Sequence, residues 1–273
     1  MKATTSAFVL FFSFLTICGF AGHEKNAHGG RSAAMSFTDV CLKDFWSLRN
    51  NQAGLAWIKA PAAGIYYENR FGLKELGFQS AGFVYPFSFG TIGITADYFG
   101  DENYNEMTAG LAWGMKLHEK LSAGIQLDYL STFINLERFN KASTVTFEIG
   151  LLYQVNDEIW VGMHVYNPIQ QEMKSEAYEK VPAVFSFGAL FEVSDKLIFT
   201  GETEKITDKK ESFHIGAEYE ILKDTYARVG ISTRETLFSF GFETNVNSLK
   251  LQLASSMHQS LGFSPMASIV YQF

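Results

Sequence analysis

The feature that most limits the fold of this chain is an alternation of apolar residues with small or polar ones, repeated in fourteen runs. In one run, Phe238, Phe240 and Phe242 are separated by single small residues. Successive side chains of a β-strand point to opposite faces, so each run predicts a strand with one apolar and one mixed face. The predicted strands are 60–71, 73–86, 90–99, 105–117, 119–134, 141–155, 157–167, 180–194, 196–206, 211–222, 224–233, 235–245, 247–257 and 260–273.

The polar faces of these runs carry charge, which raises the question of which face points outward. A single strand fits either a soluble sandwich with its apolar face inside or a membrane barrel with its apolar face in lipid. Fourteen strands that follow a secretion signal favour the membrane barrel. The predicted lumen-facing residues are Glu68, Arg70, Asp97, Asp128, Glu148, Glu218, Arg228 and Glu243.

The connections between the runs provide a second test of the barrel. An even strand count places both ends of the chain on the periplasmic side, where bacterial barrels have short turns. Tight connections recur at every second position, at 86–90, 117–120, 156–157, 194–196, 223–224 and 245–247. The intervening connections, 100–106, 134–141, 167–180 and 207–211, are longer and polar. This parity predicts a transmembrane antiparallel β-barrel in the bacterial outer membrane.

The chain divides into three parts. Residues 1–21 have the pattern of a secretory signal peptide, with a basic start at Lys2, an apolar run and the cleavage sequence Gly19-Phe20-Ala21. Residues 22–58 lack alternation and predict an N-terminal plug or packed arm, with a short helix that begins at Asp44 as its N-cap. We call residues 22–58 the plug segment. Residues 59–273 form the predicted barrel.

Composition excludes several functions. The chain is 47% hydrophobic and 15% aromatic, and its net charge of −7 argues against a nucleic-acid partner. No nucleophile elbow, Walker loop or dinucleotide fingerprint is present, so the sequence predicts no enzyme and no cofactor. The acidic stretch 101–106 lacks the spacing of a known calcium loop, and removal of the signal would leave Cys41 as a lone cysteine, so no metal site is predicted either.

Glycine recurs about once per strand on the predicted inner face, for example at Gly64, Gly82, Gly150 and Gly230. Glycine weakens a strand unless the wall must bend or another chain segment must come close to the backbone. Two explanations therefore stay open: the glycines curve the barrel wall, or they make room for the plug segment inside it.

The last strand and the plug segment resemble known proteins. An apolar terminal strand with Tyr271 at the third-last and Phe273 at the last position resembles the assembly signal of outer-membrane barrels. The plug segment resembles that of the PorV/PorQ barrels of Bacteroidetes, which are related in architecture to FadL channels, although Gln52 stands where that family usually has proline. The residues that carry this second resemblance are Gly30, Arg31, Asp44, Trp46, Asn50, Asn51 and Gly54.

The resemblance implies a non-enzymatic, plugged barrel whose partners are outer-membrane lipid, the barrel-assembly machinery and secretion-system or other envelope proteins. It implies a role in type IX secretion or surface attachment, or in binding another partner. The connection 167–180 is the longest outer one, so we expect it to be the contact. The alternative is a FadL-like channel for hydrophobic small molecules, which would need an apolar pocket near the outer end and an opening in the wall. Acidic and small residues dominate the predicted inner face, which favours the first role.

Overall fold

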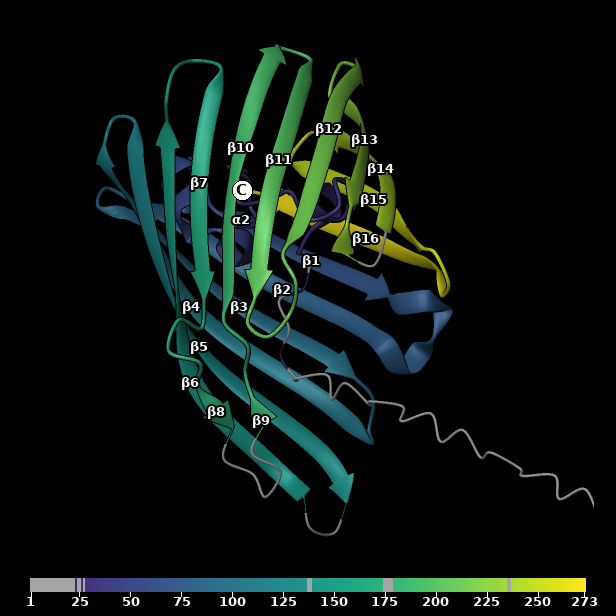
Figure 1. Cartoon of the computed structure of the whole chain (residues 1–273). Helices are drawn as coiled ribbons and strands as arrows, with labels where there is room; N and C mark the ends of the chain where they lie inside the picture. Colours follow the sequence, from purple (N-terminus) through teal and green to yellow (C-terminus); the bar gives the residue numbers. More distant parts are fainter. Residues whose placement is uncertain (1–22, 24–25, 27, 137–138, 174–178, 235–236) are drawn as a thin grey trace, which may run out of the picture.

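A computed structural model describes residues 23, 26, 28–136, 139–173, 179–234 and 237–273; the predicted signal peptide lies outside the described residues. Fourteen antiparallel strands close into a barrel, as the alternation predicts (Figure 1). The barrel strands are β1 (Ala62–Asn69), β2 (Gly77–Phe87), β3 (Gly90–Gly100), β4 (Tyr104–His118), β5 (Leu121–Leu136), β6 (Phe139–Gln154), β7 (Ile159–Tyr166), β10 (Val184–Ser194), β11 (Leu197–Ile206), β12 (Ser212–Leu222), β13 (Thr225–Ser232), β14 (Leu237–Val246), β15 (Leu249–His258) and β16 (Gly262–Gln272).

The last strand closes the barrel by pairing with the first. The register of β1 on β16 runs from Ala62 opposite Gln272 to Glu68 opposite Met266. Beyond the last pair, the Phe273 amide donates to the Pro61 carbonyl oxygen at 2.9 Å. Closure removes both free sheet edges, so backbone groups along the seam are satisfied within the wall, as a membrane-spanning sheet requires.

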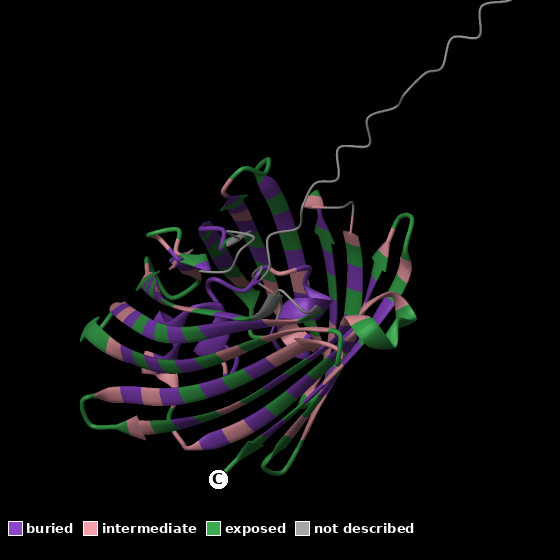
Figure 2. Cartoon of the chain, turned by 90° about the horizontal axis from the view of Figure 1, so that it is seen from below, coloured by how far each residue is buried: buried purple, intermediate pink, exposed green. Residues whose placement is uncertain are grey.

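The two faces of the wall differ in the sense expected of a membrane barrel. Apolar side chains on the outer face are widely exposed, including Ile65 at 58% and Phe213 at 60%. Polar residues between them are buried inside, and Figure 2 shows this alternation as bands along the strands. Among the described residues, no helix has the length and apolar character needed to span a bilayer.

The connections also show an asymmetry, with two differences from the prediction. We call the end with the short turns 88–89, 195–196 and 247–248 the periplasmic end, and the opposite end the outer end. The prediction of a loop over 134–141 is wrong, because the pairing of β5 with β6 continues outward to Leu136 and Phe139. The connection between β7 and β10 contains the short strands β8 (Glu172–Met173) and β9 (Glu179–Lys180), which the sequence did not predict.

The plug segment lies inside the barrel and holds α1 (Gly30–Ala34), α2 (Ser47–Asn50) and the 3₁₀-helix η1 (Gln52–Trp57). The helix predicted from Asp44 begins three residues later, because the Asp44 carboxylate accepts from the Trp46 amide at 2.9 Å and closes a turn before the helix. The first strand ends at Asn69 rather than 71, since η2 (Arg70–Gly72) and η3 (Lys74–Leu76) follow it.

The inner glycines make room for the plug segment. A Cβ atom added to Gly64 would lie 2.6 Å from the Phe45 ring, and one added to Gly82 would lie 2.7 Å from Leu48. The plug backbone itself occupies the space over Gly230. Such distances are shorter than van der Waals contact, so most of these positions need glycine for close approach. Gly110 faces other wall residues and Gly262 faces open space, so those two are exceptions.

The hydrophobic core of this molecule is therefore the contact between plug and wall. One cluster packs Phe45, Trp46 and Leu48 of the plug against strand residues that include Tyr66 and Val84. A second packs plug residues such as Val40 and Leu42 against Leu152 and Leu190. These clusters fix the plug segment in place, and the polar site is built around them.

Candidate functional site: the plug anchors and the outer apolar cluster

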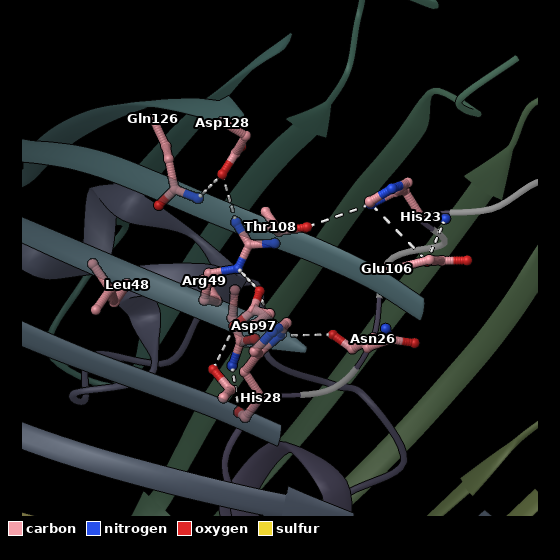
Figure 3. A network of polar contacts seen from close by, with 12 residues as sticks. His23, Asn26, His28, Leu48, Arg49, Asp97, Glu106, Thr108, Gln126 and Asp128 are labelled. Atoms are coloured by element: carbon pink, nitrogen blue, oxygen red, sulfur yellow. Dashed lines mark hydrogen bonds and ion pairs between the residues drawn. The ribbon is translucent and has the colours of Figure 1, made fainter. Parts of the chain in front are cut away.

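Arg49 of α2 joins the plug to three neighbouring parts of the wall (Figure 3). Its guanidinium lies 3.1 Å from Asp97 of β3, 2.9 Å from Asp128 of β5 and 2.9 Å from Glu148 of β6. All three carboxylates occupy inward-facing positions of their strands. The two-residue period of each strand turns its carboxylate toward the lumen, where the three surround the guanidinium. Because Arg49 is only 9% exposed, these are buried charge pairs.

Glu148 also binds two further groups beside Arg49. Its carboxylate lies 2.7 Å from Nε2 of His164 and 3.0 Å from Nε2 of Gln52. Gln126 donates to Asp128 at 2.7 Å. Buried carboxylates are tolerated only with such partners, and removal of one partner from a buried pair costs roughly 3–5 kcal/mol. This cluster is thus a strong anchor for the plug.

A second anchor lies nearer the periplasmic end. Arg31 of α1 donates to both carboxylate oxygens of Glu218 at 2.7 Å, a bidentate pair. Arg228 of the wall links the same Glu218, at 2.5 Å, to Glu243, at 2.8 Å. Asp44 of the plug lies 3.3 Å from Arg31 and completes the group. Two guanidinium groups face three carboxylates here, and each carboxylate contacts at least one guanidinium.

Backbone contacts hold the middle of the plug. The amides of Asp39 and Val40 donate to Glu202 of β11 at 2.9 and 3.0 Å. The Asn51 side-chain amide donates to the Val40 carbonyl at 2.6 Å and to the Leu151 carbonyl of β6 at 3.2 Å. Its carbonyl oxygen accepts from the Ala53 amide and caps η1. One asparagine therefore joins two parts of the plug to the wall.

The two plug arginines keep their charge at any physiological pH. Burial alone would lower the pKa of each guanidinium, but Glu218 and Asp44 raise the pKa of Arg31, and Asp97, Asp128 and Glu148 raise that of Arg49. Burial, assisted by Glu202, raises the pKa of the Cys41 thiol, so this buried cysteine stays protonated and unreactive. Neither guanidinium therefore titrates in that range.

The structure places most of the expected site residues at these contacts. Seven of the eight expected lumen residues are buried on the inner face; these are Glu68, Asp97, Asp128, Glu148, Glu218, Arg228 and Glu243. Arg70 differs, because β1 has already ended there; it lies in η2, half-buried, 3.2 Å from Glu68. Tyr271 and Phe273 lie on the outer face, with ring centroids 4.9 Å apart.

The residues of the plug motif act as local ties to the wall or within the plug. The Gly30 amide donates to Gln252 at 2.9 Å, and the Trp46 indole donates to Ser268 at 3.0 Å. The Asn50 amide donates to the His28 carbonyl at 3.1 Å. Gly54 packs against the Leu42 carbonyl, where a Cβ would come within 2.6 Å. Each of these residues thus contributes to seating the plug.

The arginine that pairs with three carboxylates of the wall was not predicted from the sequence. Arg49 was not singled out, although it is a cation in a short, otherwise uncharged helix facing a wall of predicted acidic positions. His23, His28, Glu202 and Gln252 were also missed. An excess of inward carboxylates over inward cations was the available signal, since buried carboxylates require partners from elsewhere in the chain.

Cavities lie on both sides of the plug. A small polar cavity of about 30 Å³ faces the outer end, between His28, Asp97, Glu106 and the ring of Tyr166. A larger one of about 250 Å³ opens toward the periplasmic turns and is lined by the second anchor together with Lys196 and Lys250. The first has room for one or two water molecules, and the plug separates it from the second.

An apolar cluster lies at the outer end of the inner face. Its members are Leu130, Ala142, Tyr166, Met173, Val181, Val184 and Ile206. Tyr166, Val184 and Ile206 are neighbours across β7, β10 and β11, while Met173 and Val181 come from the connection 167–183. We call this set the outer apolar cluster. It corrects the expectation of a lumen without apolar surface, since residues distant in sequence meet here at strand ends.

The barrel wall changes beside this cluster. The pairing of β6 with β7 ends at Glu148 opposite Tyr166, yet β6 extends outward to Phe139. The connection 167–183 covers this stretch, with β8 against β6, and Figure 1 shows β8 and β9 beside the outer half of β6. Asn167 fixes the cover at its base, accepting from Thr146 at 2.6 Å and donating to the Val181 carbonyl at 2.7 Å. Here the wall is closed by a loop connection instead of a strand ladder.

The fold and the plug together define a plugged outer-membrane β-barrel of FadL-like architecture. The chain is similar to the toluene transporter TodX of Pseudomonas putida, with a TM-score of 0.69 and 12% identity over 92% of this chain and 99% of that one. It is similar to the toluene transporter TbuX of Ralstonia pickettii, with a TM-score of 0.68 and 12% identity over 91% and 99%.

A FadL homologue of Pseudomonas aeruginosa gives a TM-score of 0.61 and 11% identity, over 89% of this chain and 96% of that one. No family model and no curated protein matches the sequence. The similar structures are outer-membrane barrels, and the fold places this protein in the outer membrane. Among the described residues, no group of three His, Cys, Asp or Glu side chains could hold a metal ion.

Proposed function

We propose that the barrel conducts small apolar molecules through the outer membrane. The observation that carries the proposal is the outer apolar cluster, which lies where β6 outgrows β7 and a loop connection closes the wall. An apolar molecule gains about 25 cal/mol for each Å² of apolar surface it buries. The cluster is packed in this structure, and displacement of the connection that covers it would open an apolar binding surface there.

Because of the plug, a lateral route through the wall costs less free energy than a route along the barrel axis. Passage along the barrel axis would require the buried pairs of Arg49 and Arg31 to separate, at several kcal/mol for each charge left without a partner. Passage from the outer end to the cluster, and out beside the outer half of β6 where the connection 167–183 covers the wall, leaves both anchors intact. The described contacts of the connection 167–183 with the wall are apolar packing and neutral hydrogen bonds, which cost less to break, and its ion pair of Glu172 with Lys180 lies within the connection.

The comparisons support a channel for apolar molecules over the secretion-associated role that the sequence favoured. Two of the similar structures are named as toluene transporters, and these share the barrel architecture. A FadL-like channel needs an apolar pocket near the outer end. The outer apolar cluster supplies apolar side chains there, and they would line such a pocket once the connection 167–183 moves.

A secretion-associated barrel of the PorV/PorQ type is the second candidate. The plug motif favours it, together with the connection 167–183, whose Ile169 is 54% exposed at the outer end and available to a partner. In that case the partners would be envelope or secreted proteins, captured with the barrel in mild detergent. Deletion of the gene would then remove surface-attached proteins and leave the uptake of apolar compounds unchanged.

The test of the channel is a near-isosteric change in the cluster. Val184→Thr places a hydroxyl in the apolar site while keeping a β-branched residue in β10. A buried hydroxyl without a partner costs about 1–3 kcal/mol, so uptake of radiolabelled toluene at low concentration should fall about tenfold in cells that carry the variant.

Ile169→Thr is the matched control, since Ile169 lies in the connection that precedes β10 but is exposed. It should leave uptake within twofold of the parent. Equal uptake by the Val184→Thr barrel, at equal abundance in the membrane, would remove the cluster from the route and with it the proposal.

A further inference from the structure

His28 of the plug has an unusual hydrogen-bonding arrangement (Figure 3). Its Nδ1 lies 2.9 Å from the backbone carbonyl oxygen of Asn26, and its Nε2 lies 3.3 Å from Oδ2 of Asp97. A carbonyl oxygen can only accept. Asp97 already accepts from the Ser80 hydroxyl at 2.6 Å and lies 3.1 Å from the Arg49 guanidinium, so it too acts as an acceptor.

A neutral imidazole carries one N–H and cannot donate to both acceptors. The doubly protonated ring satisfies both. His28 is 3% exposed, so water does not readily replace the bond that a neutral ring would lose. The arrangement therefore fits the imidazolium and leaves one buried acceptor without its donor when the ring is neutral.

His214 shows that this is not general for the histidines of the lumen. Its Nδ1 lies 2.7 Å from the Ser36 carbonyl, but its Nε2 lies 2.9 Å from the Ser212 hydroxyl, which can donate. A neutral ring therefore satisfies both contacts of His214. His23 is likewise within reach of two threonine hydroxyls, of Thr132 and Thr108.

The surroundings of His28 carry charges of both signs. The Phe78 ring of β2 lies edge-on at 5.2 Å and Trp46 at 6.4 Å, and neither ring competes for the proton. The charged and titratable groups of the described residues that pair with it or line the same cavity are Asp97 of β3, Arg49 of α2, Glu106 of β4, Glu148 of β6, Tyr166 of β7 and His23 of the plug. The cavity beside the ring is thus lined by three carboxylates and one guanidinium.

We propose that His28 is a proton-dependent latch that holds the outer end of the plug against β3. With the ring doubly protonated, the residues around His28 are fixed by Asp97, by the Asn50 amide on the His28 carbonyl, and by the contact of Arg70 with Asn26. When the ring loses its second proton, one of these bonds is lost and the segment loosens.

The latch lies beside the proposed route. The cavity that His28 closes is also lined by Tyr166, a member of the outer apolar cluster. Loosening of the segment would widen this cavity toward the cluster, so the acidity outside the cell would regulate access to it. Only this consequence rests on the proposed function; the latch itself concerns the position of the plug.

Hydrogen exchange of the full barrel in lipid nanodiscs tests the latch without any transport measurement. Exchange of backbone amides in peptides covering residues 23–35 is followed by mass spectrometry at pH 5.5 and pH 8.0 and corrected for the intrinsic pH dependence of exchange. Protection should fall about tenfold at the higher pH, because a buried bond to a charged group is lost.

Two variants locate the effect. His28→Lys keeps a cation at both pH values and should abolish the fall in protection, whereas His214→Gln should retain it. An unchanged protection in the parent, or an equal fall in His28→Lys, would overturn the proposal. Histidine-selective ¹⁵N NMR of the parent gives a second measurement: both His28 nitrogens should be protonated at pH 5.5 and one at pH 8.0, and a neutral ring at both values would also overturn it.

Discussion

At the scale of single residues, this lumen is built from glycines and charges whose meaning depends on what faces them. Alternation alone indicates that Asp97, Asp128 and Glu148 point inward. It cannot indicate that one arginine from a short helix binds all three, since that depends on where the plug lies. The same holds for Gly230, whose lack of a side chain is explained only by the Met35–Ser36 backbone over it.

Gly230→Ala tests the fit between plug and wall. The new Cβ would lie 2.6 Å from the Ser36 amide nitrogen and 2.7 Å from the Met35 Cα, and backbone atoms cannot rotate away. We expect a loss of about 1–3 kcal/mol in the free energy of unfolding, measured by urea denaturation in detergent. Gly201→Ala, which meets nothing within 4 Å, should stay within about 0.5 kcal/mol of the parent.

At the scale of elements, the plug and the connection 167–183 close different parts of the barrel. The plug fills the lumen with ion pairs, while the connection covers the gap in the wall with apolar contacts and Asn167. The strands themselves were predictable from their period. The short helices of the plug were not, because Asp44 and Asn51 satisfy backbone groups through turns that local propensity does not distinguish.

Deletion of residues 23–58 tests the plug as an element. Barrels of sixteen or more strands contain an aqueous channel and those of eight are filled by side chains, so a fourteen-stranded barrel without its plug should have an open lumen. We expect a steady single-channel conductance in planar bilayers that the complete chain lacks. A barrel that inserts but conducts no better than the complete chain would show that the plug segment does not block the lumen.

At the scale of the whole molecule, the seam between β1 and β16 decides whether the sheet has edges. Phe273 completes that seam with its backbone bond to Pro61, and its ring lies 6.3 Å from that of Phe83 and 4.9 Å from that of Tyr271. The resemblance of this strand to an assembly signal leads us to propose the barrel-assembly machinery as a partner of the chain.

Removal of Phe273 should therefore reduce assembly of the barrel in the outer membrane several-fold, measured as the fraction of heat-modifiable, folded protein on gels. Phe273→Tyr keeps the aromatic ring and the backbone bond, so it should assemble at the parental level. Normal membrane insertion of the truncated chain would mean that the earlier pairs of β16 with β1 suffice for closure.

The sequence by itself determined the strands, their faces and the closed barrel, because a period of two is a local property that survives whatever the chain packs against. It also indicated that glycines and carboxylates would line the lumen. Only the tertiary structure decided that the plug occupies the space over the glycines, that Arg49 and Arg31 neutralise the carboxylates, and that Tyr166, Met173 and Val184 form one apolar cluster. Those contacts join residues far apart in the chain, and no local pattern encodes which of them meet.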